Sequence, residues 1–287
     1  MIFKTESKQT TISKKVSLKG VGLHTGQEVE INFLPAEIND GYKFCRIDLE
    51  GHPIINADAN LVTNTQRGTC LEKNGVSIQT CEHVLAALVG LEIDNVIIEL
   101  STSEPPIMDG SSKYFIEALE SAEIKELDAF REVFIVKDVI SYVDEESGSE
   151  ITIIPSEEYQ ITTMVDFGTK VLGTQNATLQ HLSNFKKHIS DSRTFSFLHE
   201  LEMLLEKGLI KGGDLNNAIV YVDKPLSEET MERLKLAFNK DSIAVTSNGI
   251  LDNLTLHYPN EAARHKLLDV IGDLALIGTR IQGKVIA

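Results

Sequence analysis

The stretch ARHKLLDVIGDL, from Ala263 to Leu274, decides how this chain is interpreted. As a helix, it places His265, Asp269 and Asp273 on one face, at successive steps of four residues. Leucine, valine and isoleucine supply much of the remaining surface, so the helix has a large apolar area to bury. A solvent-facing row would more usually carry Lys and Glu than one imidazole and two carboxylates. The stretch therefore predicts a buried helix with a functional polar face.

His265 and Asp269 are a pair that can bind a metal ion, because side chains four residues apart on a helix converge on one point. A catalytic zinc site takes three His or carboxylate ligands and leaves a position for water. The best candidate for the third ligand is His83, in the helical stretch TCEHVLAALVGL, and its neighbour Glu82 is a carboxylate that can take a proton from water. As alternatives, His83 could cap its helix and the H-x-x-x-D pair could arise by chance, so spacing alone leaves a metal site as one hypothesis among others.

Composition limits the kind of protein. The formal net charge of −16 over 287 residues argues against a nucleic-acid partner or an anionic membrane surface, although a local Lys or Arg could still hold an anionic small molecule. The N-terminus has no apolar core of signal-peptide length, and no run reaches the roughly 20 apolar residues of a spanning helix. Cys45, Cys70 and Cys81 are scattered and odd in number, which suits reduced thiols. We expect a cytoplasmic protein without stable membrane insertion.

Strand-like and helix-like stretches alternate and then repeat, which predicts an α+β fold. In the first set, one helix should have Thr80 as its N-cap and end at Gly90. A polar, acidic stretch at 123–132 separates this set from the second. We expect two similar two-layer α/β sandwich domains, residues 1–127 and 131–287, packed with the active site between them.

Six motifs follow one another along the chain. They are GVGLHTG (20–26), TCEHVLAALVGLEIDN (80–95), PPIMDGSS (105–112), SRTFSF (192–197), GGDLNNAIV (212–220) and RHKLLDVIGDL (264–274). Together they resemble the UDP-3-O-acyl-N-acetylglucosamine deacetylases, the zinc amidases of lipid A biosynthesis. The resemblance runs from about residue 10 to residue 287, so it covers both predicted domains.

The resemblance implies a role for each residue of the metal site. His83, His265 and Asp269 match the family's zinc ligands, in agreement with their spacing. Glu82 matches its general base, and Thr194 matches the hydroxyl that stabilises the developing oxyanion. The implied reaction is hydrolysis of the acetamide of UDP-3-O-acyl-N-acetylglucosamine to UDP-3-O-acyl-glucosamine and acetate, the committed step of lipid A biosynthesis. A metal amidase with a different substrate is an alternative.

Substrate contacts and proton transfer are also implied by the resemblance. Lys266 and Phe195 match positions that contact the sugar nucleotide, and Asp273 matches the carboxylate that orients a catalytic His. His24 either borders the site or packs beneath it. In the family a Gly-His pair supplying that catalytic His follows shortly after a strand like QGKVIA, whereas this sequence stops at Ala287. We expect a C-terminally shortened chain, for which the deacetylase part of a fusion with a 3-hydroxyacyl-ACP dehydratase is one source. A non-catalytic or low-activity zinc-binding domain is the alternative.

Two segments of the second half extend beyond the six motifs. The resemblance places an acyl-binding insert at about 195–222, whose apolar residues at helical spacing are Leu198, Leu201, Leu204 or Leu205, and Leu209. An ordinary core stripe would have the same spacing. The segment 224–249 is longer than the family predicts and should form a surface helix, to which we assign no chemistry.

Overall fold

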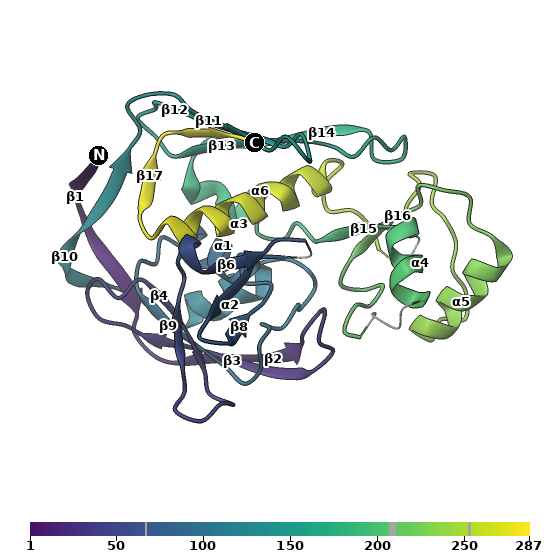
Figure 1. Ribbon diagram of the computed structural model, residues 1–287, viewed down its shortest axis with the longest axis horizontal. Helices are drawn as coiled ribbons and strands as arrows, with labels where there is room; N and C mark the ends of the chain where they lie inside the picture. Colours follow the sequence, from purple (N-terminus) through teal and green to yellow (C-terminus); the bar gives the residue numbers. More distant parts are fainter. Residues whose placement is uncertain (67, 207–210, 252–253) are drawn as a thin grey trace.

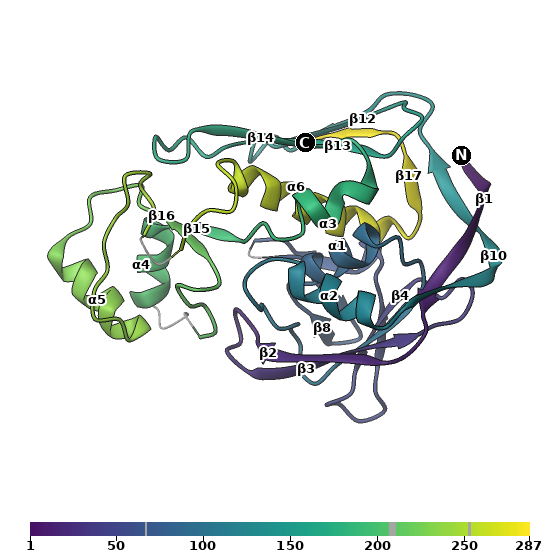
Figure 2. The ribbon, with the colours of Figure 1, turned by 180° about the vertical axis from the view of Figure 1, so that it is seen from behind.

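Two five-stranded sheets lie on opposite sides of the protein, with helices between them and a small lobe at one end (Figure 1). This is the arrangement in a computed structural model, which describes residues 1–66, 68–206, 211–251 and 254–287. The chain contains both helices and mostly antiparallel sheets, which confirms the predicted α+β class. From behind, the layers keep the same order (Figure 2), so the helices of the two halves meet at the centre.

The first sheet is built from the N-terminal part of the chain. Its strands, in spatial order, are β2 (Val16–Val21), β3 (Glu28–Pro35), β9 (Val96–Leu100), β4 (Tyr42–Arg46) and β5 (Ile54–Asn56). In β9, Val96, Ile98 and Leu100 are buried and the residues between them are partly exposed, because successive side chains of a strand point to opposite faces. The helices α1 (Glu82–Gly90) and α2 (Lys113–Ser121) cover the inner face of this sheet (Figure 1).

The helix α1 begins at Glu82 and ends at Gly90, where its end was predicted. The predicted N-cap was wrong, because Cys81 occupies that position. Thr80 has a φ of 51° and donates its hydroxyl to the buried carboxylate of Glu104 at 3.1 Å. Glu104 is fully buried, so its carboxylate depends on hydrogen bonds from the protein. The Thr80 hydroxyl donates one of these bonds and does not cap the first turn of the helix.

The second sheet combines the middle of the chain with its last strand. Its strands, in spatial order, are β11 (Ile140–Val143), β12 (Glu150–Ile154), β18 (Lys284–Ile286), β13 (Gln160–Asp166) and β14 (Thr174–Leu179). The strand β18 is antiparallel to β12 and parallel to β13. The long helix α6 (Glu261–Leu274) packs on the inner face, where Ile161, Thr163 and Val165 of β13 are buried. The helix α3 (Phe185–His188) lies in the same layer (Figure 2).

A third sheet joins the two halves of the chain. It contains β1 (Ile2–Ile12), β10 (Ile124–Ile135) and β17 (Arg280–Gln282) in that order. The stretch 123–132, predicted to separate two sets of elements, lies between the elements of the two large sheets, and almost all of it is itself a strand, β10. Its side chains alternate between exposed and half-buried, and this period of two is typical of a strand with one solvated face.

The remaining elements are short or belong to the lobe. The hairpin strands are β6 (Val62–Asn64), β7 (Cys70–Lys73) and β8 (Val76–Ile78), and the short 3₁₀ helices are η1 (Ala59–Leu61), η2 (Leu182–Asn184) and η3 (Ala275–Ile277). The lobe contains β15 (Phe195–Phe197), α4 (Leu198–Glu206), β16 (Ile219–Tyr221) and α5 (Glu228–Phe238). None of the helices in the described ranges is both long and apolar enough to cross a membrane. Cys45, Cys70 and Cys81 are free thiols.

One continuous apolar core holds the two halves together. It contains Phe33 of β3, Leu85 of α1, Leu268 of α6 and Val285 of β18, all fully buried. The lobe has a small core of its own, to which the segment 224–249 contributes α5 through its buried side chain Leu234. The predicted surface helix is thus present, and it packs on the lobe. The central contact is the one between α1 and α6.

Candidate metal centre

Three side chains from the two central helices converge on one point. The Nε2 atom of His83, on α1, lies 3.6 Å from Oδ1 of Asp269, and Nε2 of His265 lies 3.4 Å from the same oxygen. One ligand atom from each residue lies within 4.8 Å of the other two. Among the described residues, no other group of three His, Cys, Asp or Glu side chains comes together in this way. The sequence prediction named these three residues, and the structure brings them together.

The His265 ring is fixed in the form that a metal ion requires. Its Nδ1 atom lies 3.0 Å from the carbonyl oxygen of Ser192, which can only accept a hydrogen bond, so Nδ1 carries the proton. The Nε2 lone pair therefore faces Asp269. Burial lowers the pKa of His265 to about 4, because the charged imidazolium is disfavoured away from water. A neutral imidazole with a free Nε2 is the usual metal ligand.

The carboxylate of Asp269 indicates that a cation fits here. Its Oδ1 atom is buried and has no hydrogen-bond partner. Burial would raise the pKa of Asp269. At the acidic pH where a carboxyl titrates, however, His265 is itself protonated, and its charge together with that of Lys266 holds the pKa of Asp269 well below its usual range. Ligand atoms placed about 2.0–2.1 Å from zinc at tetrahedral angles lie about 3.4 Å from one another. The observed spacings of 3.4 and 3.6 Å fit that geometry, and a cation would satisfy the unpaired oxygen.

Glu82 lies beside the three ligands, as its position next to His83 predicts. It is 7% exposed, and its Oε2 atom accepts a hydrogen bond from the backbone N–H of Thr69 at 3.0 Å. Burial raises the pKa of Glu82 to about 7; the charge of His83 opposes this shift, and the charges of Asp269 and Asp273 add to it. A carboxylate with a pKa near neutrality is suited to general-base work.

Asp273 is the third acid on the polar face of α6. Its Oδ1 atom accepts a hydrogen bond from the hydroxyl of Thr69 at 2.5 Å. Burial raises the pKa of Asp273 to about 6, although the hydrogen bond from Thr69 opposes this effect. The sequence prediction did not include Thr69, because its spacing relates it to neither helix.

The motif 192–197 is attached to α6 at two points. The first is the contact between Ser192 and His265, and the second is a buried ion pair between Arg193 Nε and Glu261 Oε1 at 2.8 Å. Between these two contacts and β15, the backbone N–H of Thr194 donates to the carbonyl oxygen of Gly110 at 2.8 Å. Thr194 is thus held between the first half of the chain and α6, with its side chain half-buried.

The two predicted substrate-binding residues also lie at this site. The Phe195 ring is 6.4 Å from that of His265, in an edge-to-face arrangement. Lys266 Nζ is 3.0 Å from Oδ2 of Asp269 and 5.8 Å from the centroid of Phe195. The charge of Asp269 raises the pKa of Lys266, so the half-exposed amine stays protonated. An anionic group of a ligand that packs on Phe195 would therefore lie near the positive charge of Lys266.

The first motif, 20–26, is held by one buried acid. The carboxylate of Glu104 accepts hydrogen bonds from the backbone N–H groups of His24 and Thr25, at 2.9–3.1 Å, and from the Thr25 hydroxyl. The motif also touches the lobe, because Gly212 donates its N–H to Leu23 at 3.2 Å. The contact fixes the backbone of His24 at the junction of the lobe and the first sheet.

The predicted acyl-binding segment lies in the lobe. Leu198 and Leu201 are buried in the lobe core, whereas the side chains of Leu204 and Leu205 and the whole of Leu209 lie outside the described residues. Next to them, an aromatic cluster contains Phe167, Phe195, Phe197 and Tyr221, with ring centroids 5.4–6.1 Å apart. This cluster forms an apolar wall that begins at the candidate metal centre.

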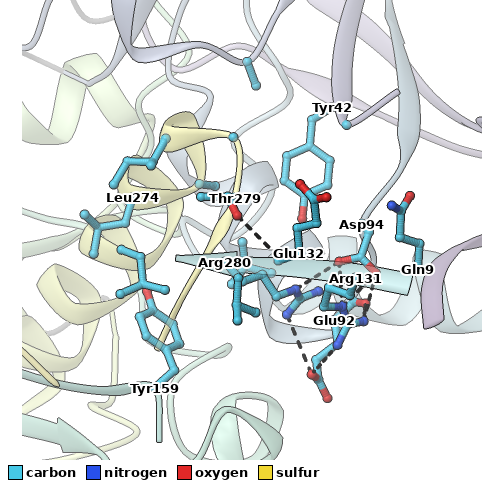
Figure 3. Close-up of a pocket in the computed structure, with 18 of the residues that line it drawn as sticks. Gln9, Tyr42, Glu92, Asp94, Arg131, Glu132, Tyr159, Leu274, Thr279 and Arg280 are labelled. Atoms are coloured by element: carbon cyan, nitrogen blue, oxygen red, sulfur yellow. Dashed lines mark hydrogen bonds and ion pairs between the residues drawn. The ribbon is translucent and has the colours of Figure 1, made fainter. Parts of the chain in front are cut away.

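A separate cavity of about 1010 Å³ lies where the C-terminal ends of α1 and α6 meet the third sheet (Figure 3). None of the eight predicted site residues lines it. Its polar wall is an ion-pair network in which Asp94 accepts from Arg131 and Arg280 at 2.8–3.1 Å. The network ties β10 and β17 to the loop after α1, and it leaves the buried Nη1 and Nη2 atoms of Arg280 without a hydrogen-bond partner among the described residues.

Two imidazoles and a carboxylate around one point, with a second carboxylate beside them, are typical of metal-dependent hydrolases. The chain matches the family described as "LpxC: UDP-3-O-acyl N-acetylglycosamine deacetylase" over residues 9–238 and 229–287, and it belongs to that family. The two matched pieces meet in α5, within the segment that is longer than the family predicts.

Individual relatives support the same family. The "Bifunctional enzyme LpxC/FabZ" of Bacteroides thetaiotaomicron is 45% identical over 280 residues, which are 98% of this chain and 61% of the relative. That of Porphyromonas gingivalis is 44% identical, with the same coverage. The "UDP-3-O-acyl-N-acetylglucosamine deacetylase" of Saccharophagus degradans is 39% identical, covering 96% of this chain and 84% of the relative. The chain therefore spans about three fifths of the bifunctional relatives.

Proposed function

We propose that this protein is a zinc-dependent deacetylase, which hydrolyses the acetamide of UDP-3-O-acyl-N-acetylglucosamine to UDP-3-O-acyl-glucosamine and acetate. This reaction is the committed step of lipid A biosynthesis. The observation that carries the proposal is the convergence of His83, His265 and Asp269 around the unpaired Oδ1 of Asp269. Family membership supports the substrate, and the donor set supports the metal.

His83, His265 and Asp269 would hold the zinc ion. When bound, zinc supplies Lewis-acid chemistry that acidifies water and polarises an amide carbonyl. Glu82 takes a proton from the attacking water as the water oxygen bonds to the acetamide carbon. The hydroxyl of Thr194 donates to the oxyanion that develops there. The C–N bond then breaks, and the amine leaves with a proton returned by the protonated Glu82, which is thereby restored to a carboxylate.

The remaining predictions belong to this proposal. Lys266 and Phe195 would bind the sugar nucleotide, and Asp273 would orient a proton donor. The segment at about 195–222 would hold the acyl chain, a role supported by the aromatic wall next to His265. Residues 1–127 and 131–287 would form two sandwich domains, supported by the two sheets and their facing helices. The bifunctional relatives support a fused acyl-ACP dehydratase as a partner. The cytoplasmic location also belongs to the proposal.

The experiment that tests the function is an acetate-release assay with UDP-3-O-(3-hydroxyacyl)-N-acetylglucosamine. We expect turnover that a chelator abolishes and added zinc restores. The same sugar nucleotide without its acyl chain should react at least tenfold more slowly. Turnover that survives complete metal removal would exclude the metal mechanism. A metal-loaded protein that binds this substrate without releasing acetate would instead support the non-catalytic alternative.

A further inference from the structure

We infer that Thr69 is a positioning residue that holds both acids beside the metal centre, Glu82 through its backbone N–H and Asp273 through its hydroxyl. The two hydrogen bonds measure 3.0 Å and 2.5 Å. Thr69 is 5% exposed, so water does not compete for either bond. The inference rests on the proposed function, because it assigns Thr69 a part in that reaction.

Thr69 is itself fixed from a third side. Its carbonyl oxygen accepts from the backbone N–H and the thiol of Cys81, each at 3.5 Å. Cys81 is the N-cap of α1, and Asp273 lies on α6, so one residue before β7 contacts both ligand-bearing helices. A Cβ atom on Gly68 would lie 2.9 Å from Oε1 of Glu82, so the carboxylate packs closely against this backbone.

The two hydrogen bonds from Thr69 determine which carboxylate oxygens of Glu82 and Asp273 remain free to take part in the reaction. The N–H of Thr69 occupies Oε2 of Glu82, so its other oxygen stays available for a proton from water. The hydroxyl of Thr69 favours the ionised form of Asp273 and fixes the rotamer of that side chain. Partners that orient groups around a metal site change activity by about 10–100-fold when they are lost. Because no direct substrate contact is lost, we expect an effect on kcat rather than on KM.

The test is Thr69→Val, which keeps the shape and the backbone N–H but removes the hydroxyl. We expect kcat for acetate release to fall about tenfold with KM within about twofold and bound metal unchanged. Thr69→Ser should restore most of kcat. The control is Thr163→Val, because Thr163 is also buried and donates its hydroxyl to α6, at Ala263, 2.9 Å away. If Thr163→Val lowered kcat as much, or if Thr69→Val lost metal, the role would be structural and the inference overturned.

A second measurement does not need activity. The urea midpoints of wild type, Thr69→Val, Asp273→Ala and the double variant form a cycle that reports the coupling of the two side chains. We expect the double variant to shift the midpoint by less than the sum of the single shifts. Additive shifts would overturn the inference. If the wild type itself released no acetate, the proposed function would fail, and this cycle alone would decide whether Thr69 holds Asp273.

Discussion

Glu82 shows how a single carboxylate can be prepared for proton transfer. It is buried, it accepts one hydrogen bond from Thr69, and burial raises its pKa to about 7. An acid with an ordinary pKa would be a weaker base at neutral pH, whereas a strongly raised one would already be protonated. The pKa of Glu82 lies between these two limits, and Glu82 is the sequence neighbour of the candidate ligand His83.

Replacing Glu82 by Gln should separate metal binding from catalysis. The amide keeps the shape but cannot accept a proton, so we expect kcat to fall by about 10²–10⁴-fold with one metal ion still bound. Acetate release and metal content measure the two effects. Glu120→Gln is the control, because Glu120 pairs with Lys186 at the surface and should leave both quantities unchanged. Glu82→Gln activity within threefold of wild type would rule out the general-base role.

At the residue scale, contacts between residues close in the sequence could be predicted, and contacts between distant residues could not be predicted from spacing. The convergence of His265 and Asp269 follows from their spacing on one helix. The partnership of His83 does not, because nearly two hundred positions separate it from α6. Its neighbour Glu82 made His83 the best candidate among the histidines, and the family motifs agreed. Thr69 was missed, since a lone threonine before a short strand carries no pattern that predicts contacts to two helices.

At the scale of elements, the central feature is the close contact of α1 and α6. A Cβ atom on Gly272 would lie 2.0 Å from the backbone carbonyl oxygen of Glu82, closer than any real contact. The two helices can therefore approach this far only with glycine at that position. The approach brings His83 within ligand distance of His265 and Asp269. Gly272 is thus part of the metal site's geometry, although it carries no side chain.

Gly272→Ala should weaken metal binding. Helix propensity alone would stabilise α6 by about 1 kcal/mol, but the clash forces α6 away from α1. We expect zinc affinity, measured by chelator competition, to fall at least tenfold, together with a lower urea midpoint. Gly148→Ala is the control, because a Cβ atom on Gly148 would have no neighbouring atom within 4 Å. The φ of 72° at this turn position means that the alanine adds backbone strain without a steric clash. Unchanged zinc affinity in Gly272→Ala would show that the contact does not set the site.

Secondary structure was predictable where the pattern is local and less so elsewhere. The periodicity of the second-half helix predicted α6, and the resemblance agreed. The acidic stretch 123–132 was not predicted to be a strand, because its partners β1 and β17 come from opposite ends of the chain. Thr80 was misassigned because the acid that binds it, Glu104, lies 24 positions further on. Both errors concern contacts that no short window contains.

At the scale of the whole molecule, the helices α1 and α6 take part in two separate sites. One is the candidate metal centre. The other is the cavity beside the third sheet, where Asp94 accepts from Arg131 and Arg280 (Figure 3) and also from the backbone N–H of Thr10 at 2.9 Å. These partners come from β1, β10 and β17, so this network fixes the joining sheet to the first half of the chain. The α+β class was predictable from sequence, whereas this joining sheet was not, and the division into two domains stays a prediction.

The central claim is that two distant parts of the chain meet around one divalent cation. A crystal of the zinc-loaded protein, with anomalous difference maps on either side of the zinc absorption edge, tests it most directly. We predict one strong peak about 2.0–2.2 Å from Nε2 of His83, Nε2 of His265 and a carboxylate oxygen of Asp269. No peak there, or a peak bound by other residues, would contradict the account.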